Sequence, residues 1–217
     1  MTDRLRRHFI LSATVSALAG LYGAPALAQA KAPRSILVLG DSLSAEYGLP
    51  RGTGWVALLE QRLASEKLTA TVINASVSGD TTSGGRARLP ALLAQHKPGV
   101  VVIELGGNDA LRGLPIKNTE DNLAAMVQAA QKAGARVLLV GMQVPPNYGS
   151  DYALRFAGVF EAVARQYKTA VVPFFLEGVA NSPDAARLFQ PDRIHPNAQA
   201  HPMMLDNVWP ALRKLLS

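Results

Sequence analysis

Residues 35–44 read S-I-L-V-L-G-D-S-L-S. The apolar run from Ile36 to Leu39 includes β-branched residues and stops at a Gly-Asp-Ser turn signal, which is typical of a strand buried on both faces. In open α/β sheets, functional sites are built beyond the carboxyl ends of the strands. Ser42 is therefore a candidate nucleophile. For this tripeptide taken alone, an ordinary strand-to-helix turn remains the alternative.

Beyond this stretch, short apolar runs alternate with amphipathic segments, which predicts a parallel sheet flanked by helices. The expected strands are Ile36–Gly40, Ala70–Asn74, Val100–Leu105, Arg136–Gly141 and Thr169–Val172. Five strands separated by helices predict an α/β fold of three layers, α/β/α, around a five-stranded parallel sheet in flavodoxin-like order.

Apolar residues spaced three and four apart predict helices around residues 55–63 and 123–130. Thr53 and Thr119 are the expected N-caps of these two helices, because a threonine side chain accepts hydrogen bonds from first-turn N–H groups. Gly134 is well placed to end the second helix.

Residues 1–30 have the features of a cleavable signal peptide, which leaves residues 31–217 as one domain. Three arginines precede a moderately apolar run at 9–21, and small-x-small patterns occur within 26–30. The Arg6-Arg7 pair also resembles a twin-arginine signal, and the twin-arginine and Sec routes both remain open. The apolar run is too short to span a bilayer comfortably. We expect a periplasmic or secreted protein with no stable membrane insertion after leader removal.

Composition narrows the possible functions of the domain. The chain has no cysteine, which excludes disulfides, a thiolate nucleophile and thiolate metal ligands. The formal net charge of +6 is scattered, without a basic run beside aromatic residues, so nucleic-acid binding is disfavoured. The length suits a single domain with a sizeable core, and we expect a monomer.

Four polar clusters follow predicted strands or precede the last helix. They are 40–42, 78–80, 106–109 and 192–195. Acyl transfer by a serine needs a base, a group that orients the base, and donors for the developing oxyanion. His195 is the candidate base for Ser42, and Asp192 the group that orients it. The Ser42 N–H, the Gly79 N–H and the Asn108 side-chain amide are candidate oxyanion donors.

Together these clusters resemble the blocks of a known family. G-D-S-L at 40–43, Gly79, G-x-N-D at 106–109 and D-x-x-H at 192–195 are similar to the four blocks of the SGNH (GDSL) hydrolases. Further likeness at 74–81, 88–93 and 147–149 points to the bacterial thioesterase I/lysophospholipase L1/arylesterase branch. The resemblance implies the flavodoxin-like SGNH hydrolase fold and a serine hydrolase without cofactor. Its substrates would be small-molecule acyl esters and thioesters of short to medium chain length.

Transferred position by position, the resemblance implies Ser42, Asp192 and His195 as the triad and Ser42, Gly79 and Asn108 as the oxyanion hole. It also implies a mobile substrate loop at about 111–115. The expected substrate-binding residues are Leu43, Gly107, Leu111, Leu114, Pro145 and Tyr148. Glu46 stands where a small residue is expected, which predicts a carboxylate on the pocket rim that disfavours anionic substrates such as acyl-CoA.

Two alternatives remain beside this hypothesis. A non-enzymatic periplasmic binding protein on a similar sheet would have no need for Ser42, Asn108 and His195 together. A polysaccharide or peptidoglycan O-deacetylase would use the same triad, and activity confined to acetyl groups on sugars would distinguish it. A metal site built from His195 and His201 has no supporting ligand cluster in the sequence.

Overall fold

The computed structural model describes residues 34–216, apart from the side chains of Arg34 and Pro146. The predicted signal peptide, residues 1–30, lies outside the described residues. The domain predicted to follow it contains all of them.

Five parallel strands form one sheet in the order β2-β1-β3-β4-β5. They are β1 (Arg34–Gly40), β2 (Ala70–Asn74), β3 (Val100–Glu104), β4 (Arg136–Val140) and β5 (Ala170–Val172). This is the flavodoxin-like order, so the predicted fold class and all five strands are confirmed, with ends that differ by one or two residues.

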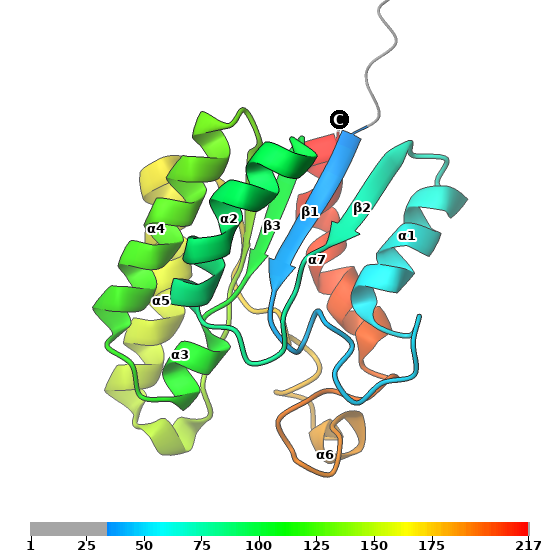
Figure 1. The fold of residues 1–217 in the computed structure, drawn as a ribbon. Coiled ribbons are helices and arrows are strands. Elements are labelled where there is room, and N and C mark those ends of the chain that lie inside the picture. The colour runs from blue at the N-terminus through cyan, green and yellow to red at the C-terminus, as the bar shows by residue number, and fades with distance from the viewer. Residues whose placement is uncertain (1–33, 217) are drawn as a thin grey trace, which may run out of the picture. The chain divides into compact units, whose positions relative to one another are not determined.

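Helices cover both faces of the sheet (Figure 1). Helices α2 (Thr82–His96), α4 (Ile116–Lys132) and α5 (Ser150–Tyr167) lie on one face, and α1 (Trp55–Ser65) and α7 (His201–Leu216) lie on the other. Three short helices lie in the connections: α3 (Gly107–Leu111), the 3₁₀ helix η1 (Pro146–Tyr148) and α6 (Ala185–Leu188).

The central strands β1 and β3 explain both the core and the position of the site. Residues 36–40 and 100–104 are buried, as their continuous apolar runs predict for strands covered on both faces. The chain leaves β1 toward β2 on one side and leaves β3 toward β4 on the other. The strand order therefore reverses between β1 and β3, and a crevice opens beyond their carboxyl ends. The polar clusters at 40–42 and 106–109 follow these two strands.

The observed helix ends agree only in part with those predicted from the sequence. The prediction that Thr53 caps α1 is wrong: Gly54 is the N-cap, and its N–H donates to Glu46 Oε1 at 2.8 Å. Thr119 is not an N-cap either, because α4 begins one turn earlier and buries this residue inside the helix. Gly134 follows the end of α4 with φ +84°, as predicted for a residue that ends a helix.

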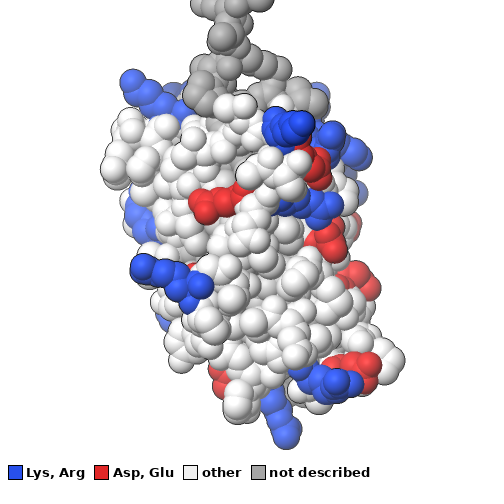
Figure 2. Space-filling view, turned by 90° about the vertical axis from the view of Figure 1, so that its right-hand side faces the viewer, with Lys and Arg blue, Asp and Glu red and all other residues white. Residues whose placement is uncertain are grey.

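The face that carries α1 and α7 has lysine, arginine, aspartate and glutamate side chains interspersed (Figure 2). Two exposed ion pairs join these helices, Arg62–Asp206 at 2.6 Å and Arg213–Glu66 at 3.1 Å. Within residues 34–216, no helix combines the length and apolarity needed to cross a membrane.

Candidate active site

The turn after β1 is built around a glycine with no room for a side chain. Gly40 pairs in register with Glu104, and a Cβ on Gly40 would lie 2.7 Å from Ser44 Oγ and 2.8 Å from Glu104 Oε2. Those two side chains are hydrogen-bonded to each other, because Ser44 Oγ donates to Glu104 Oε2 at 2.7 Å. Trp55 Nε1 in turn donates to Ser44 Oγ at 3.0 Å. A buried polar row thus supports the turn that carries Ser42.

Two buried carboxyl groups lie beside this turn. Burial, and then the nearby charge of Asp41, raises the pKa of Glu104 well above its usual 4.5. Burial also raises the pKa of Asp41 to about 6, although hydrogen bonds from the Leu43 N–H and the Asn108 side chain oppose the shift. Asp41 is only 3% exposed. Burial thus favours the neutral form of Glu104, while Asp41, with a pKa of about 6, is mostly ionised at neutral pH.

Ser42, His195 and Asp192 form one continuous hydrogen-bonded row. His195 Nε2 lies 2.9 Å from Ser42 Oγ, and His195 Nδ1 lies 2.7 Å from Asp192 Oδ2. With Nδ1–H facing the carboxylate, Nε2 is free to accept the serine proton. The structure thus brings together three residues that are up to 153 positions apart.

Asp192 is held as an anion by its own turn. Its Oδ1 accepts hydrogen bonds from the backbone N–H groups of His195 and Ile194, each at 3.0 Å. The His195 N–H, then the His195 ring and the Ile194 N–H, lower the pKa of Asp192 to about 2. The carboxylate is therefore charged at neutral pH and can stabilise an imidazolium on His195.

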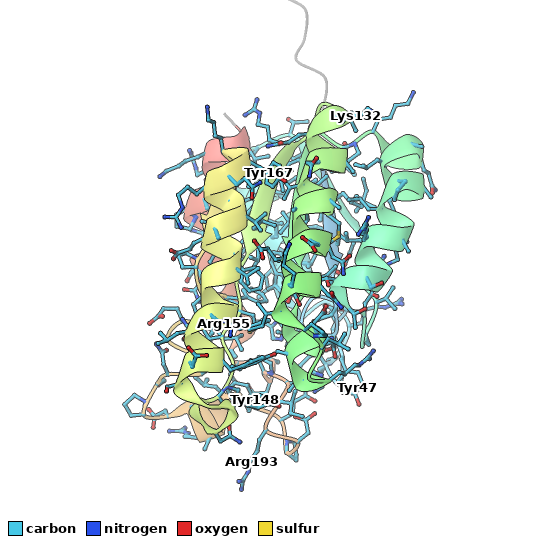
Figure 3. The ribbon with its side chains drawn as sticks, turned by 90° about the vertical axis from the view of Figure 1, so that its left-hand side faces the viewer. Tyr47, Lys132, Tyr148, Arg155, Tyr167 and Arg193 are labelled. Carbon is cyan, nitrogen blue, oxygen red and sulfur yellow. The ribbon has the colours of Figure 1, made fainter. Side chains whose placement is uncertain are left out.

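Tyr47 is a neighbour of His195 that sequence reasoning missed. Its ring centroid lies 4.4 Å from that of the imidazole, tilted by 39°. Gln190 joins the two loops, because its Nε2 donates to Tyr47 O at 2.9 Å and its N–H donates to His195 O at 2.8 Å. Figure 3 shows Tyr47 at the same end of the molecule as Tyr148 and Arg193. No spacing rule links positions 47 and 195, so only the folded chain reveals this contact.

The three predicted oxyanion donors differ in their present partners. Among the described residues, neither the Ser42 N–H nor the Gly79 N–H has a hydrogen-bond acceptor. Gly79 has φ +80°, a left-handed conformation that suits glycine. Asn108 Nδ2 donates to Asp41 Oδ2 and to Asp80 O, both at 2.9 Å. The Asn108 amide thus lies between the residue before Ser42 and the residue after Gly79.

The loop predicted to be the substrate loop contacts the Gly79 turn. Arg112 Nη2 donates to Gly79 O at 2.7 Å. Leu114 N–H donates to Asp109 O at 2.9 Å, which ties the same loop to α3. Arg112 was not identified from the sequence, where an arginine in a loop gives no signal for a backbone partner.

The residues expected to bind substrate fall into two groups. Leu43 packs in the hydrophobic core, and Gly107 and Leu114 are half-buried. Leu111, Pro145 and Tyr148 are exposed.

Glu46 is held by the loop that leads into α1. It has φ +58°, and its carboxylate accepts hydrogen bonds from the N–H groups of Gly52 and Gly54 at the start of α1. Its expected effect on anionic substrates stays a prediction. Two loop N–H groups at a helix N-terminus are a better environment for this charge than open solvent.

His201 joins the start of α1 to the His195 loop. Its Nδ1 accepts a hydrogen bond from the Trp55 N–H at 2.9 Å, and its ring also bonds to the Pro196 carbonyl. Burial lowers the pKa of His201 to about 4, so the ring is neutral at pH 7. Across residues 34–216, no three histidine, aspartate or glutamate side chains gather as metal ligands would.

Comparison with known proteins places this geometry in a family. The profile of the GDSL-like lipase/acylhydrolase family matches residues 38–202. The chain is 54% identical to esterase TesA of Pseudomonas aeruginosa over 92% of this chain and 98% of that protein. It is 41% identical to thioesterase 1/protease 1/lysophospholipase L1 of Escherichia coli K12 over 87% of this chain and 88% of that protein.

Solved structures of similar proteins support the same family assignment. A crystal structure of TesA superposes with a TM-score of 0.81 at 55% identity, covering 84% of this chain and 99% of that one. The psychrotrophic esterase EstA from Pseudoalteromonas sp., solved with monoethylphosphonate as inhibitor, gives 0.79 at 40% identity, covering 84% and 98%. Because the family profile spans most of the domain and a relative with over half its residues identical covers nearly the whole chain, the protein belongs to the GDSL-like lipase/acylhydrolase family.

Proposed function

We propose that this protein is a serine hydrolase that cleaves short- to medium-chain acyl esters and thioesters through an acyl-enzyme on Ser42. The observation that carries the proposal is the row from Ser42 Oγ to His195 to Asp192, with distances of 2.9 and 2.7 Å, beyond the carboxyl ends of β1 and β3. Membership of an acylhydrolase family supports the same reaction class.

In acylation, His195 Nε2 takes the proton from Ser42 Oγ as this oxygen attacks the substrate carbonyl carbon. The ionised Asp192 stabilises the imidazolium that results. The imidazolium then donates its proton to the leaving alcohol or thiol as the acyl–oxygen or acyl–sulfur bond breaks. Water, deprotonated by His195, hydrolyses the acyl-enzyme and regenerates Ser42.

The negative charge on the carbonyl oxygen needs donors that are already in place. The Ser42 and Gly79 N–H groups, which have no acceptor among the described residues, would supply two. The Asn108 amide would supply the third by turning the N–H that now bonds to Asp80 O toward the oxyanion, while its other N–H stays on Asp41. Removing one such donor typically costs about 10²- to 10³-fold in kcat.

Apolar side chains on the same edge of the sheet support an acyl substrate. Tyr47, Leu111, Tyr148 and Ile194 are large apolar residues that remain exposed on the loops and short helices after the strands. The relatives carry the names arylesterase and thioesterase 1/protease 1/lysophospholipase L1, which suggests tolerance of different leaving groups.

The test is a kinetic panel of p-nitrophenyl esters and acyl thioesters of increasing chain length, measured for the wild type and Ser42→Ala. The wild type should hydrolyse both classes, and Ser42→Ala should lose turnover while keeping its circular dichroism spectrum. Retained turnover in Ser42→Ala would refute the nucleophile assignment. Activity confined to acetyl groups on sugars would instead favour the O-deacetylase alternative.

We also propose export of the domain to the periplasm or medium, supported by the leader-like composition of residues 1–30. Cell fractionation of the full chain, beside a chain that starts at residue 31, tests the proposal. An Arg6→Lys/Arg7→Lys double substitution should block export only if the twin-arginine route is used. Equal distribution of the full and shortened chains would contradict export by this leader.

A further inference from the structure

Within the part of the chain that the structure describes, no cationic side chain bonds to the buried carboxylate of Asp41. Its Oδ1 accepts the Leu43 N–H at 3.0 Å, and its Oδ2 accepts Asn108 Nδ2 at 2.9 Å. The first bond closes a turn around Ser42, and the second orients the Asn108 amide. One carboxylate therefore touches both sides of the proposed oxyanion hole.

Both contacts need an acceptor, and the ionised carboxylate offers two equivalent, strongly accepting oxygens. A protonated Asp41 would turn one of its oxygens into a donor. An asparagine at position 41 would keep one acceptor but direct an NH₂ group at Leu43 or at Asn108. The contacts therefore select the charged aspartate over its neutral isostere.

Keeping this charge works against folding. Burial disfavours the anion and raises the pKa of Asp41 to about 6 from 3.8. The titratable groups that face it are His195, which favours the anion when it is protonated, and Asp80, which opposes it, with the carboxyl of Glu104 next to the Asp41 N–H. Since the folded state binds the proton more tightly than the unfolded chain, stability falls as pH rises from about 4 to about 6. The full cost is present above this range.

We infer that Asp41 is a positioning residue that holds the Ser42 turn and the Asn108 amide in place for oxyanion stabilisation. This inference rests on the proposed function and adds a residue to it. Asp41 does not touch the substrate, and its effect on the reaction passes through Asn108 and the Ser42 backbone. A purely structural role would not predict a loss of kcat at nearly constant KM, so this pair of values separates the two roles.

The test is Asp41→Asn, which keeps the size of the side chain and removes the charge. We expect kcat for p-nitrophenyl esters to fall about 10- to 100-fold with KM changed less than about threefold, because a displaced oxyanion donor acts in the transition state. The melting temperature of the variant relative to the wild type should be several degrees more favourable at pH 7.5 than at pH 4.5, because only the wild type gains stability as Asp41 takes up its proton. Most of the cost of the Asp41 charge is absent at pH 4.5.

Asp109→Asn is the matched control, because Asp109 is equally buried and lies beside Asn108. Its Oδ2 accepts the Thr82 N–H at 2.8 Å, and its Oδ1 accepts the hydroxyls of Thr82 and Thr119. These bonds join α2, α3 and α4 and do not involve the serine turn. Asp109→Asn should therefore lower the melting temperature, and its kcat should fall less than that of Asp41→Asn.

A double-mutant cycle tests whether Asp41 acts through Asn108. In an Asn108→Ala background, Asp41→Asn should lower kcat by much less than it does alone. Equal effects in both backgrounds, an unchanged kcat, or a melting-temperature difference from the wild type that does not change between pH 7.5 and pH 4.5 would each overturn the inference. Failure of the proposed function is separate, because it would appear as turnover retained in Ser42→Ala.

Discussion

Replacing His201 with glutamine should remove a specific acid sensitivity of the fold. His201 is 2% exposed, accepts the Trp55 N–H at Nδ1 and bonds to the Pro196 carbonyl through its ring. Glutamine can make the same two bonds with its carbonyl oxygen and its NH₂ group, but it does not titrate. The variant therefore keeps the contacts and loses only the protonation.

The sign of the pH effect on stability depends on whether the folded or the unfolded protein binds the His201 proton more tightly. Burial lowers the pKa of His201 to about 4 in the folded protein, against 6.5 in a model peptide. A proton on Nδ1 would also face the Trp55 N–H, so the charged ring loses that bond. The unfolded chain takes up the proton first, and stability from this residue is present above pH 6.5 and is lost as pH falls toward 4.

The magnitude comes from the two pKa values. Each unit of difference is worth about 1.4 kcal/mol once the pH lies below both values. Between pH 7.5 and 5, most of the unfolded chain becomes protonated and little of the folded protein does. His201 should therefore reduce the free energy of unfolding by about 2 kcal/mol over this interval.

Urea unfolding at pH 7.5 and pH 5, followed by the fluorescence of the buried Trp55 and Trp209, measures this term. Other acids shift stability in both proteins, and Asp41 shifts it in the opposite direction. The informative quantity is thus the difference between the pH responses of the wild type and His201→Gln. The variant should lose about 2 kcal/mol less than the wild type. Identical responses would refute a neutral, buried His201.

Three further substitutions probe other contacts of the site and core. Tyr47→Leu should lower kcat about two- to fivefold, because it removes an aromatic ring that favours the imidazolium on His195. Stopped-flow measurement of the acylation rate tests this effect, and faster acylation in the variant would contradict the role. Arg112→Ala should lower kcat about fivefold with KM little changed, because it removes the bond to Gly79 O; a change in KM alone would make Arg112 a substrate-binding residue. Phe156→Ala, in the core of α5, should cost about 3–5 kcal/mol in urea unfolding, and a loss below about 1 kcal/mol would show that the core collapses into the space.

The strands were predictable because a strand buried on both faces has a continuous run of apolar residues in the sequence. Residues 100–104 read V-V-V-I-E and form a fully buried strand, as expected. Helix α2 leaves no such mark. It contains Pro90 and, near its start, Gly85, at which a Cβ would lie 2.2 Å from Leu105 Cδ1. Because α2 packs closely at a glycine, its contact with the core is not marked by a continuous row of apolar residues in the sequence.

The helix caps show where local patterns fail. Thr53 is in the correct place to cap α1, but its hydroxyl donates to the Pro50 carbonyl instead. Glu46, eight residues before Gly54, and His201, on the last helix, take the N–H groups at the start of α1. Hydrogen-bond partners this distant in sequence depend on how the loops fold, so the spacing of residues along the helix cannot predict them.

The polar clusters could be predicted because each follows a strand or precedes the last helix, but the support beneath Ser42 could not. Gly40 is readily identified as part of a turn. The reason why this position must be glycine is visible only in the folded sheet. Strand pairing places Gly40 opposite Glu104, and the hydrogen-bonded side chains of Glu104 and Ser44 occupy the space that a Cβ on Gly40 would need. Glu104 is an acidic residue near the end of an apolar run, and its own segment gives no signal that it is buried. Its burial follows from β3 lying between β1 and β4, so that its last residue sits under the serine turn. A residue's chemistry can be identified from its own segment, whereas its burial and the direction of its pKa shift depend on the strands beside it.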